Sequence, residues 1–519
     1  MERSRGILAV SPHARRGTRL RQETLEVELL KRARANRKRS GAHPSYAFIS
    51  THRKAAQMLD CVVTDAKIVN HTGIFEGEIG IRDGRITQVA KGISETTDRK
   101  VSARGKMVLP GLVDGHTHME FPFMGTVTAD DFESGTVASA CGGVTTIIDF
   151  SIQPKGSSLL ETYELWRKKA DPKVCVDYSL HMVIREANQA NLNQIRQIIR
   201  KGVQSVKLFM TYRRDGLLMS DINIYRIMKE VAKYGGVVGL HCENNDYIEC
   251  LVSEFLAAEK TEPYYHAKSR PPEAEVEAVR RATTLAGFAN ANMYVVHMST
   301  RGAMESVVEA RNRGLDVYAE TCPHYLTFTE NMYRGLAAKN YVMSPPLRRR
   351  EDKEALWLGL ASGQIRTVAS DHCCFTSEQK DLGKEDFSRI PNGVPGTEVI
   401  LPILYHGVSR GLISLERLVQ LTSYNPARQF GLFPRKGTIQ VGSDADIVVL
   451  DPKKRQRLSK DNLHSRMDNS IYERITVTGF PVLTLSRGRV VHEDGQFVGK
   501  RGGGSYVPGR PHSVRPKDL

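Results

Sequence analysis

Histidine and aspartate side chains end several apolar runs of this chain, and their types suit a metal ion. His116 and His118 close the run MVLPGLVDGHTH and are separated by one residue. Side chains at positions i and i+2 project from the same face of a strand, so both imidazoles can reach one ion. Other apolar runs end in His241, His297 and Asp371. Imidazole and carboxylate ligands suit zinc, with manganese, iron and cobalt as alternatives, so we expect a metal centre here.

A lysine, Lys207, lies inside the apolar run Ser-Val-Lys-Leu-Phe-Met. A charged lysine is expensive to bury, so one interpretation is a snorkelling or ion-paired side chain. The other is a lysine carboxylated by CO2, because the resulting carbamate is anionic and its two oxygens can bridge two metals. The metal-ligand types that end the neighbouring runs favour the carbamate.

Other polar residues of these runs are predicted to support the ligands. A single histidine in a strand is more often a hydrogen-bonded core residue than a ligand. We therefore assign His181, His324 and His372 to core or supporting positions. Glu243 and Asn244 closely follow His241, and we expect them to orient its ring.

Eight apolar, β-rich runs recur through the middle of the chain. They are residues 107–118, 144–150, 176–183, 205–212, 237–243, 293–300, 316–322 and 366–374. Segments with helical spacing separate them, among them residues 191–200, 224–233, 274–286 and 301–313. Strands that alternate with helices and are apolar on both faces are typical of a (β/α)8 TIM barrel. The active site of such a barrel lies at the C-terminal ends of its strands, where the candidate ligands fall.

Both ends of the chain carry short strand patterns separated by Gly, Asp and Asn turns. Near the N-terminal end they begin at Met58, and near the C-terminal end they include residues 437–439, 445–450, 475–477 and 482–484. The sequence therefore predicts an α/β fold in which both ends of the chain build one small β-sandwich beside the barrel. The predicted domain ranges are 1–57 (basic extension), 58–107 (first β part), 108–434 (barrel), 435–500 (second β part) and 501–519 (C-terminal tail).

Several longer motifs resemble the hydantoinase/dihydropyrimidinase family of the amidohydrolase superfamily. The likeness extends from about residue 58 to about residue 511. The motifs are Asp114-Gly-His-Thr-His118, Ser205-Val-Lys-Leu-Phe-Met-Thr-Tyr212, His241-Cys-Glu-Asn244, Ser344-Pro-Pro-Leu-Arg348, Ser370-Asp-His-Cys373 and Ile390-Pro-Asn-Gly393.

The resemblance implies a pair of divalent metal ions, with zinc the first expectation. His116, His118 and Asp371 would bind one ion. His241 and His297 would bind the second, and the carboxylated Lys207 would bridge the two. The ions would share a hydroxide whose pKa they lower toward neutrality.

The resemblance also implies roles for residues that contact the substrate. Asp371 would take a proton from the attacking hydroxide and pass it to the departing ring nitrogen. Tyr212 would hydrogen-bond the developing oxyanion. Ser344 and Asn392 would hold the ureide edge of the ring. Without the resemblance, loop packing explains Tyr212, Ser344 and Asn392 equally well.

The residues that follow the His-x-His pair indicate a neutral ring. Relatives that open acidic rings place an arginine there, whereas this chain has Met-Glu-Phe-Pro-Phe at 119–123. We expect an apolar ring substituent to lie against loop 119–126 and the segment after Tyr212. The predicted activity is that of a dihydropyrimidinase or D-hydantoinase, which open 5,6-dihydropyrimidines or 5-substituted hydantoins to N-carbamoyl amino acids. The alternatives are an allantoinase-like or other cyclic-amide hydrolase, and a non-catalytic scaffold of the same family.

The charge of the chain is unevenly distributed. Its 519 residues carry a net charge of +16, but residues 1–57 hold 14 Lys and Arg against 4 Asp and Glu. The basic excess is therefore largely a property of this segment, and we expect no nucleic-acid partner. We interpret residues 1–57 as an organelle-targeting peptide or as upstream sequence absent from the mature protein, with a disordered basic tail as the third reading.

The rest of the composition is that of an ordinary globular protein. Hydrophobic residues make up 40% and charged residues 25%, which excludes wholesale disorder. No run of about 18 apolar residues predicts a membrane span, and the eight scattered cysteines favour reduced thiols. We expect a cytoplasmic protein that acts on a small neutral cyclic ureide or imide and forms a homotetramer or homodimer. The tail after residue 500 is predicted to contact a neighbouring subunit or to stay disordered.

Overall fold

The computed structural model describes residues 58–511 of the chain. The predicted basic extension, residues 1–57, and the last part of the predicted tail, residues 512–519, lie outside the described residues. Within the described part, none of the helices combines the length and the apolar character that crossing a membrane requires.

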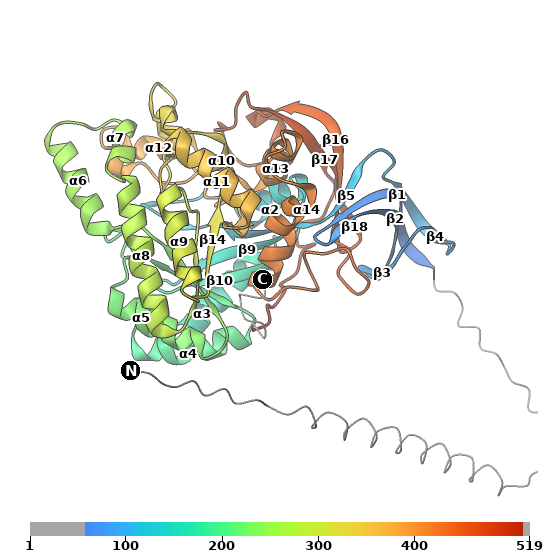
Figure 1. Ribbon diagram of the computed structural model, residues 1–519, viewed down its shortest axis with the longest axis horizontal. Coiled ribbons are helices and arrows are strands. Elements are labelled where there is room, and N and C mark those ends of the chain that lie inside the picture. Colours follow the sequence, from blue (N-terminus) through green and yellow to red (C-terminus); the bar gives the residue numbers. More distant parts are fainter. Residues whose placement is uncertain (1–57, 512–519) are drawn as a thin grey trace, which may run out of the picture. The chain divides into compact units, whose positions relative to one another are not determined.

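An eight-stranded parallel sheet forms the barrel (Figure 1). Its strands are β6 (Leu112–Thr117), β9 (Val144–Ile152), β10 (Asp177–Val183), β11 (Ser205–Phe209), β12 (Val237–His241), β13 (Asn292–Val295), β14 (Val317–Thr321) and β15 (Thr367–Val368). Each strand overlaps one of the eight predicted runs, although β9 and β13 extend one or two residues beyond theirs, and nearly every residue is buried, as expected for strands covered on both faces. The predicted TIM-barrel fold is confirmed.

The first and last strands meet through the residues that follow them. The backbone N–H of His118 donates to the carbonyl of His372 at 2.9 Å, and the backbone N–H of Ser370 donates to Asp114 Oδ1, also at 2.9 Å. Thr117 and His372 are paired in a parallel bridge. These bonds bring the ends of β6 and β15 together, so the His-x-His segment and Asp371 share one rim of the barrel.

Helices cover the outside of the barrel (Figure 1). They are α2 (Phe132–Cys141), α3 (Leu159–Ala170), α4 (Gln189–Arg200), α5 (Asp221–Ala232), α6 (Asn245–Ala257), α7 (Pro263–Lys268), α8 (Pro272–Ala289), α9 (Arg301–Asn312), α10 (Pro323–Thr327), α11 (Arg350–Ser362), α12 (Ser377–Lys380), α13 (Ile400–Ser409), α14 (Leu415–Val419) and α15 (Asn425–Gln429). The four predicted helical segments correspond to α4, α5, α8 and α9. In α4 the buried residues Leu192, Ile195, Ile198 and Ile199 recur at helical spacing and form the apolar face.

Short turns lie in the connections between these elements. The 3-10 turns are η2 (Glu330–Tyr333), η3 (Ala338–Tyr341), η4 (Asp381–Gly383), η5 (Phe387–Arg389), η6 (Thr397–Val399) and η8 (Lys460–Asn462), and η7 (Gln420–Tyr424) is a π turn. A two-stranded hairpin, β7 (Pro122–Phe123) with β8 (Thr126–Val127), follows the His-x-His segment. It is the only regular structure in loop 119–126.

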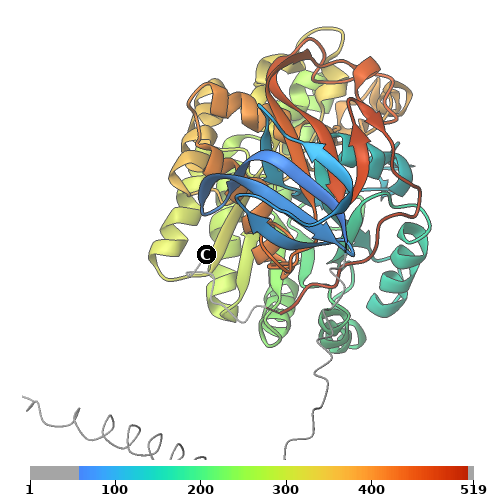
Figure 2. The same ribbon diagram turned by 90° about the vertical axis from the view of Figure 1, so that its right-hand side faces the viewer.

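A second sheet joins the two ends of the described chain (Figure 2). Its strands are β1 (Leu59–Asn70), β2 (Gly73–Arg82), β3 (Arg85–Ala90), β4 (Thr97–Ser102), β5 (Met107–Pro110), β16 (Ile447–Arg457), β17 (Thr476–Ser486), β18 (Arg489–Glu493) and β19 (Gln496–Phe497). β5 pairs with β1 on one side and with β16 on the other. The sheet therefore contains segments more than 300 residues apart, as the prediction of one β-domain built from both ends requires.

The passage from this β-domain into the barrel is abrupt. β5 ends at Pro110 and β6 begins at Leu112. At Gly111 between them, an added Cβ would lie 2.1 Å from Thr145 Oγ1, so only glycine fits. One predicted run, residues 107–118, thus supplies a strand to each domain.

The strand predicted at residues 437–439 does not form. Gly437 has φ of +84°, a conformation that ends an extended run. Thr438 and Ile439 pair with no strand and bond the Asn70 side chain. Thr438 Oγ1 donates to Asn70 Oδ1, and Asn70 Nδ2 donates to the Ile439 carbonyl. The prediction was wrong because an apolar pattern reflects only the local sequence, whereas Asn70, the residue that Thr438 and Ile439 bond, lies in β1.

The described part of the tail packs on its own barrel. Backbone N–H groups of Gly504, Val507 and Gly509 donate to carbonyls of Val174, Tyr178 and Gly202 at 2.7–3.0 Å. The Tyr506 ring lies 5.4 Å from that of Tyr178. Up to residue 511 the tail therefore lies along the same chain and is ordered, and its predicted contact with a neighbouring subunit stays a prediction.

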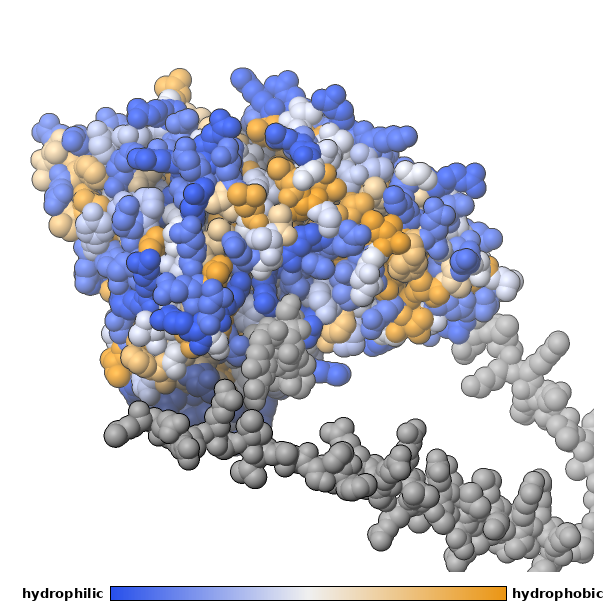
Figure 3. All heavy atoms as spheres, viewed as in Figure 1, coloured by the Kyte–Doolittle hydropathy of each residue, from blue (hydrophilic) through white to orange (hydrophobic). Residues whose placement is uncertain are grey.

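The surface drawn in Figure 3 is largely hydrophilic, with apolar side chains gathered in places. One such place is a groove beside α11 and α13, to which Leu326, Trp357, Leu358, Ile403, Leu412 and Ile475 contribute. Leu358 is 68% exposed and is the most exposed of these.

Candidate metal centre

The barrel rim brings all six predicted metal ligands around one cavity. His116 lies in β6, Lys207 in β11 and His241 at the end of β12, while His118, His297 and Asp371 follow β6, β13 and β15 by one, two and three residues. The lining residues are His116, His118, Phe121, Phe123, Lys207, Phe209, Tyr212, His241, His297, Ser344, Asp371, Cys373, Asn392 and Gly393. The predicted substrate residues Tyr212, Ser344 and Asn392 are among them, so ligand and substrate candidates share one space.

The nitrogen and oxygen atoms of the predicted ligands converge. Asp371 Oδ1 lies 3.1 Å from His116 Nε2 and 3.3 Å from His118 Nε2. Ligand atoms of His116, His297 and Asp371 all lie within 4.8 Å of one another. The rings of His241 and His297 are 4.5 Å apart between centroids. Five side chains from four strand ends therefore point toward one small volume.

A carboxylate behind His116 fixes which ring nitrogen faces the cavity. Glu320, in β14, lies with Oε1 2.7 Å from His116 Nδ1, so Nδ1–H donates to the carboxylate. Nε2 is then the ring nitrogen that faces Asp371 and the cavity. Burial lowers the pKa of His116, but Asp371 and Glu320 raise it to about 9. Two carboxylates thus favour a positive charge at this position.

A second carboxylate fixes His241 in the same way. Glu243 Oε2 accepts from His241 Nε2 at 2.7 Å and from Arg270 Nη1 at 2.7 Å. The Nδ1 atom of His241 is then the nitrogen left for an ion. Burial raises the pKa of Glu243, but Arg270 and His241 lower it to about 2, so the carboxylate stays charged. Arg270 also lies over the Tyr212 ring, 5.5 Å from its centroid.

Lys207 is buried at the centre of this group, with 1% of its surface exposed. Its amine lies 5.1 Å from the centroid of the Phe150 ring and 5.0 Å from that of Phe209. Burial lowers its pKa to about 8, against the opposing effect of Asp371 and Glu320. A lowered pKa increases the fraction of neutral amine, which is the form that reacts with CO2.

Three residues of the site hold unusual backbone conformations. Tyr212, His297 and Asp371 have φ of +65°, +37° and +48°, in the left-handed region that residues other than glycine rarely adopt. Each directly follows, or nearly follows, a barrel strand. Strained backbone of this kind clusters at functional sites, where it aims side chains.

The donor set fits a pair of divalent metal ions. His116 Nε2 and His297 Nδ1 are buried, and neither makes a hydrogen bond within residues 58–511. Buried polar atoms without partners are costly unless something else satisfies them. Imidazole nitrogens and a carboxylate oxygen that converge without bonding one another have the arrangement of ligands around cations.

The predicted substrate residues lie together in the cavity. Asn392 Nδ2 is 3.0 Å from Ser344 Oγ and 3.3 Å from the Tyr212 hydroxyl. Burial raises the pKa of Tyr212, so its hydroxyl remains protonated and can donate. The Phe123 ring, on β7, lies 5.0 Å from the Tyr212 ring and adds an apolar side to the cavity.

The structure confirms most of the predicted supporting residues and contradicts the role predicted for one of them. His181 Nε2 bonds the Gly115 carbonyl and His372 Nε2 donates to Asp130, so both support the core as predicted. His324 is also buried outside the ligand group. Asn244 does not orient His241, because its side chain accepts from the Tyr247 N–H and caps α6.

Two residues of the site were missed from the sequence. Glu320 had a signal, an acidic residue near the end of the apolar run 316–322. Arg270 had none in the strand pattern, because it precedes α8 in a connection between two helices.

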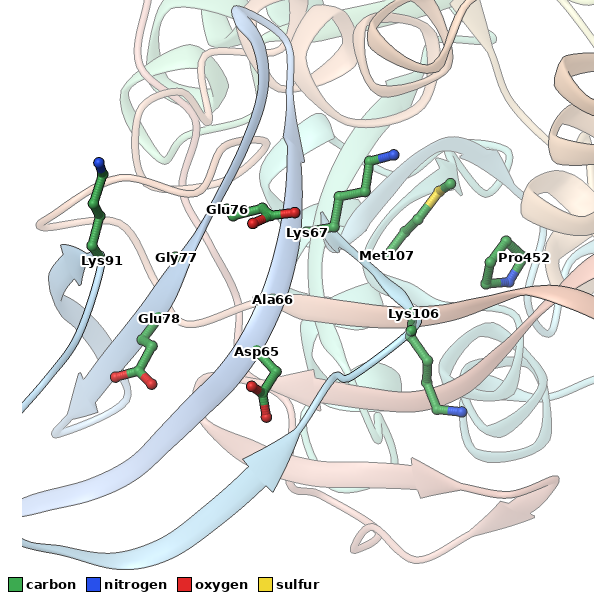
Figure 4. Close-up of a pocket in the computed structure, with 11 residues that line it drawn as sticks. Asp65, Ala66, Lys67, Glu76, Gly77, Glu78, Lys91, Lys106, Met107 and Pro452 are labelled. Carbon is green, nitrogen blue, oxygen red and sulfur yellow. The ribbon is translucent and has the colours of Figure 1, made fainter.

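A larger hollow lies away from this site, on the β-domain (Figure 4). Charged residues line it, including Asp65, Glu78, Lys91 and Lys106. Figure 4 shows their charged ends pointing in different directions, whereas the ligands at the barrel rim converge. The barrel rim is therefore the better candidate for chemistry.

Comparison with known proteins gives close relatives. The model of the Amidohydrolase family matches residues 107–491, and that of the urease alpha-subunit N-terminal domain matches residues 45–109. The chain is 43% identical over 451 residues to the D-hydantoinase of Geobacillus stearothermophilus, covering 86% of this chain and 96% of that protein.

Solved structures of similar proteins superpose on this chain. The dihydropyrimidinase from Brevibacillus agri NCHU1002 superposes with a TM-score of 0.86 at 39% identity, covering 87% of this chain and 99% of that one. The L-hydantoinase (dihydropyrimidinase) from Arthrobacter aurescens superposes with a TM-score of 0.81 at 33% identity, covering 87% and 100%.

Proposed function

Because the chain belongs to the amidohydrolase family, and within it to the hydantoinases and dihydropyrimidinases, we propose that it is a ring-opening hydrolase. Its substrates are 5,6-dihydropyrimidines or 5-substituted hydantoins, and its products are N-carbamoyl amino acids. The observation that carries the proposal is the single cavity at the barrel rim, where six metal-ligand candidates face three substrate-binding candidates. Neither group of residues would be expected to converge in a non-catalytic scaffold.

We propose that this cavity holds two divalent metal ions, most simply zinc. His116, His118 and Asp371 hold the first, His241 and His297 hold the second, and a CO2-derived carbamate on Lys207 bridges them. Such a pair supplies a hydroxide at neutral pH and polarises the ring carbonyl. The buried, unpartnered imidazole nitrogens and the lowered pKa of Lys207 support this set.

Asp371 is proposed to move the proton. Neighbouring histidines, His116 foremost, hold the pKa of its carboxyl well below the usual range, against the effect of burial. The carboxyl group is therefore ionised in the resting site. From the cavity wall it can pass that proton to the ring nitrogen as the amide bond breaks.

Tyr212 is proposed to donate its hydroxyl hydrogen to the oxygen of the attacked carbonyl as negative charge develops there. Asn392 and Ser344 are proposed to hold the ureide edge of the ring. The distances of 3.3 Å and 3.0 Å from Asn392 Nδ2 place these three side chains within reach of one small ring.

The ring itself is proposed to be neutral. Phe121 and Phe123 line the cavity on the side of loop 119–126. The segment after Tyr212 begins with the exposed Arg213 and Arg214, so only the phenylalanine side offers the apolar contact expected for a ring substituent. Arg213 is occupied by ion pairs with Asp246 and Glu249.

We also propose a cytoplasmic homotetramer or homodimer. All eight cysteines are free thiols and seven of them are buried, which supports a reducing compartment. Light scattering of the purified protein would measure the oligomeric state.

Hydrolysis of a substrate panel tests the function. The zinc-loaded, bicarbonate-treated protein is expected to open dihydrouracil or a 5-substituted hydantoin, and Lys207→Ala is expected to lose that activity. Lys229→Ala, which removes an exposed lysine of α5, is the matched control and should behave as the wild type. Turnover of allantoin alone would identify the allantoinase-like alternative, and no turnover with any ring would contradict the proposal.

A further inference from the structure

A second buried lysine, Lys380, lies outside the metal centre. It ends α12, and 1% of its surface is exposed. Its Nζ donates to three backbone carbonyls, those of Val342 at 2.7 Å, Pro391 at 2.6 Å and Gly393 at 2.8 Å. Within residues 58–511 it has no carboxylate partner within 4.0 Å, and its Nζ lies 5.6 Å from the centroid of the Phe375 ring.

Burying a lysine in this way costs free energy of folding. Burial disfavours the charged form, and it lowers the pKa of Lys380. Three carbonyl oxygens oppose that effect, since an ammonium has three N–H groups and can satisfy all three at once. A neutral amine has only two N–H groups and would leave one carbonyl facing a lone pair.

The three carbonyls belong to the two segments that carry the proposed substrate residues. Val342 precedes Ser344 by two residues, and Pro391 and Gly393 flank Asn392. The segments are also joined directly, because the Gly393 N–H donates to the Val342 carbonyl at 3.0 Å and Asn392 Nδ2 bonds Ser344 Oγ. Lys380 is therefore bonded to the backbone on either side of the residue that touches both Ser344 and Tyr212.

Neither segment contains a helix or a strand. Residues 342–349 and 390–396 follow η3 and η5, and Val394 makes an isolated parallel bridge with His372. Gly393 has φ of +150°, and a Cβ there would lie 2.1 Å from the Cys373 carbonyl, so this backbone packs directly on the segment after Asp371. A displacement of either segment would move Asn392 relative to the metal ligands.

We propose that Lys380 is a positioning residue for the substrate: its ammonium joins segments 342–344 and 391–393 so that Ser344 and Asn392 face the ring. This inference rests on the proposed function, because it assigns a purpose to these two side chains. Lys380 does not touch the cavity itself, so it acts through the backbone and not on the reacting atoms.

Substitutions of Lys380 separate positioning from general stability. Lys380→Met removes all three donors, Lys380→Gln keeps two, and Lys380→Arg keeps the charge. Lys384→Met removes an exposed lysine four residues later and is the control. With dihydrouracil, we expect Lys380→Met to raise KM about tenfold or more, with kcat changed less than about threefold and two metals retained. Lys380→Arg should recover part of the loss, and the control should match the wild type.

Hydrogen exchange supplies a readout that needs no turnover. Peptides covering residues 340–345 and 390–394 should exchange faster in Lys380→Met or Lys380→Gln, while the peptide covering β11 is unchanged. If Lys380→Met does not fold, Lys380→Gln carries both measurements. Wild-type KM with wild-type exchange, or faster exchange throughout the barrel, would overturn the inference. If the wild type opens no ring, the proposed function is contradicted. The hydrogen-exchange result then tests the role of Lys380 by itself.

Discussion

The two halves of the site are built differently. The proposed metal half consists of side chains that lie on barrel strands or within three residues after them, and two of its histidines, His116 and His241, bond the buried carboxylates of Glu320 and Glu243. The substrate half consists of Tyr212, Ser344 and Asn392, of which the last two lie on long irregular connections. The metal half is held by side chains bonding side chains, and the substrate half largely by side chains bonding backbone.

This difference predicts how each half fails. Strand ends are fixed by the sheet, so losing one supporting carboxylate should weaken metal binding without moving the barrel. The loops of the substrate half lie outside the sheet, so losing one of the bonds that join them should change substrate binding before it changes metal content. The following predictions test this separation.

The largest effect is expected at Tyr212. Tyr212→Phe removes the hydroxyl that donates to the developing oxyanion, and kcat should fall about 10²–10³-fold. Metal content should stay that of the wild type. Steady-state kinetics with parallel metal analysis measure both, and Tyr247→Phe, an exposed tyrosine of α6, serves as control. A variant with nearly wild-type kcat would remove Tyr212 from the mechanism.

An intermediate effect is expected at Glu320. Glu320→Gln leaves His116 without the carboxylate that fixes its tautomer, so affinity for the metal should fall about 10–100-fold. Competition with a chelator measures this affinity without reference to turnover. Glu305→Gln, on the exposed side of α9, should leave it unchanged. Equal affinity in the wild type and Glu320→Gln would show that His116 is fixed by packing alone.

The smallest effect concerns stability in acid. Arg270 and His241 hold the pKa of Glu243 at about 2, below its ordinary value of 4.5, although burial opposes them. A lowered carboxyl pKa contributes stability that is fully present above the ordinary value and is lost as the pH falls through the folded value. Between about pH 5 and about pH 2, the melting temperature of the metal-free wild type should therefore fall more steeply than that of Glu243→Gln, by a few degrees.

Parallel melting curves for these two proteins would contradict the assignment. Glu305→Gln is again the control, and its curve should follow that of the wild type. Because Glu243→Gln leaves Arg270 without its carboxylate, its melting temperature should be lower at neutral pH, and only the slope against pH carries the test.

The metal half was predictable from the sequence for a physical reason. Ligands at strand ends leave a local pattern, an apolar run followed by His, Lys or Asp, and spacing such as that of His116 and His118 fixes their common face. The barrel was predictable on the same ground, because buried parallel strands are apolar throughout. Glu320 carried the same kind of signal, an acidic residue in an apolar strand, and was still missed.

The substrate half was predictable only through resemblance. Ser344 and Asn392 follow no strand or helix, and the partners of Lys380 are carbonyls, which every residue has. The strand wrongly predicted at residues 437–439 fails for a related reason, since its bonding partner Asn70 is more than 360 residues away. Local patterns report strands and their ends, whereas bonds between distant loops leave no such pattern.

The central claim is that Lys207 joins two metal ions at the rim of the barrel. Metal content and ring-opening rate, measured on the same zinc-loaded preparation with and without bicarbonate, test it most directly. We predict two ions per chain and full activity with bicarbonate, and in Lys207→Ala fewer than two ions and an activity lower by about 10³-fold or more. Two tightly bound ions and wild-type turnover in Lys207→Ala would contradict the account.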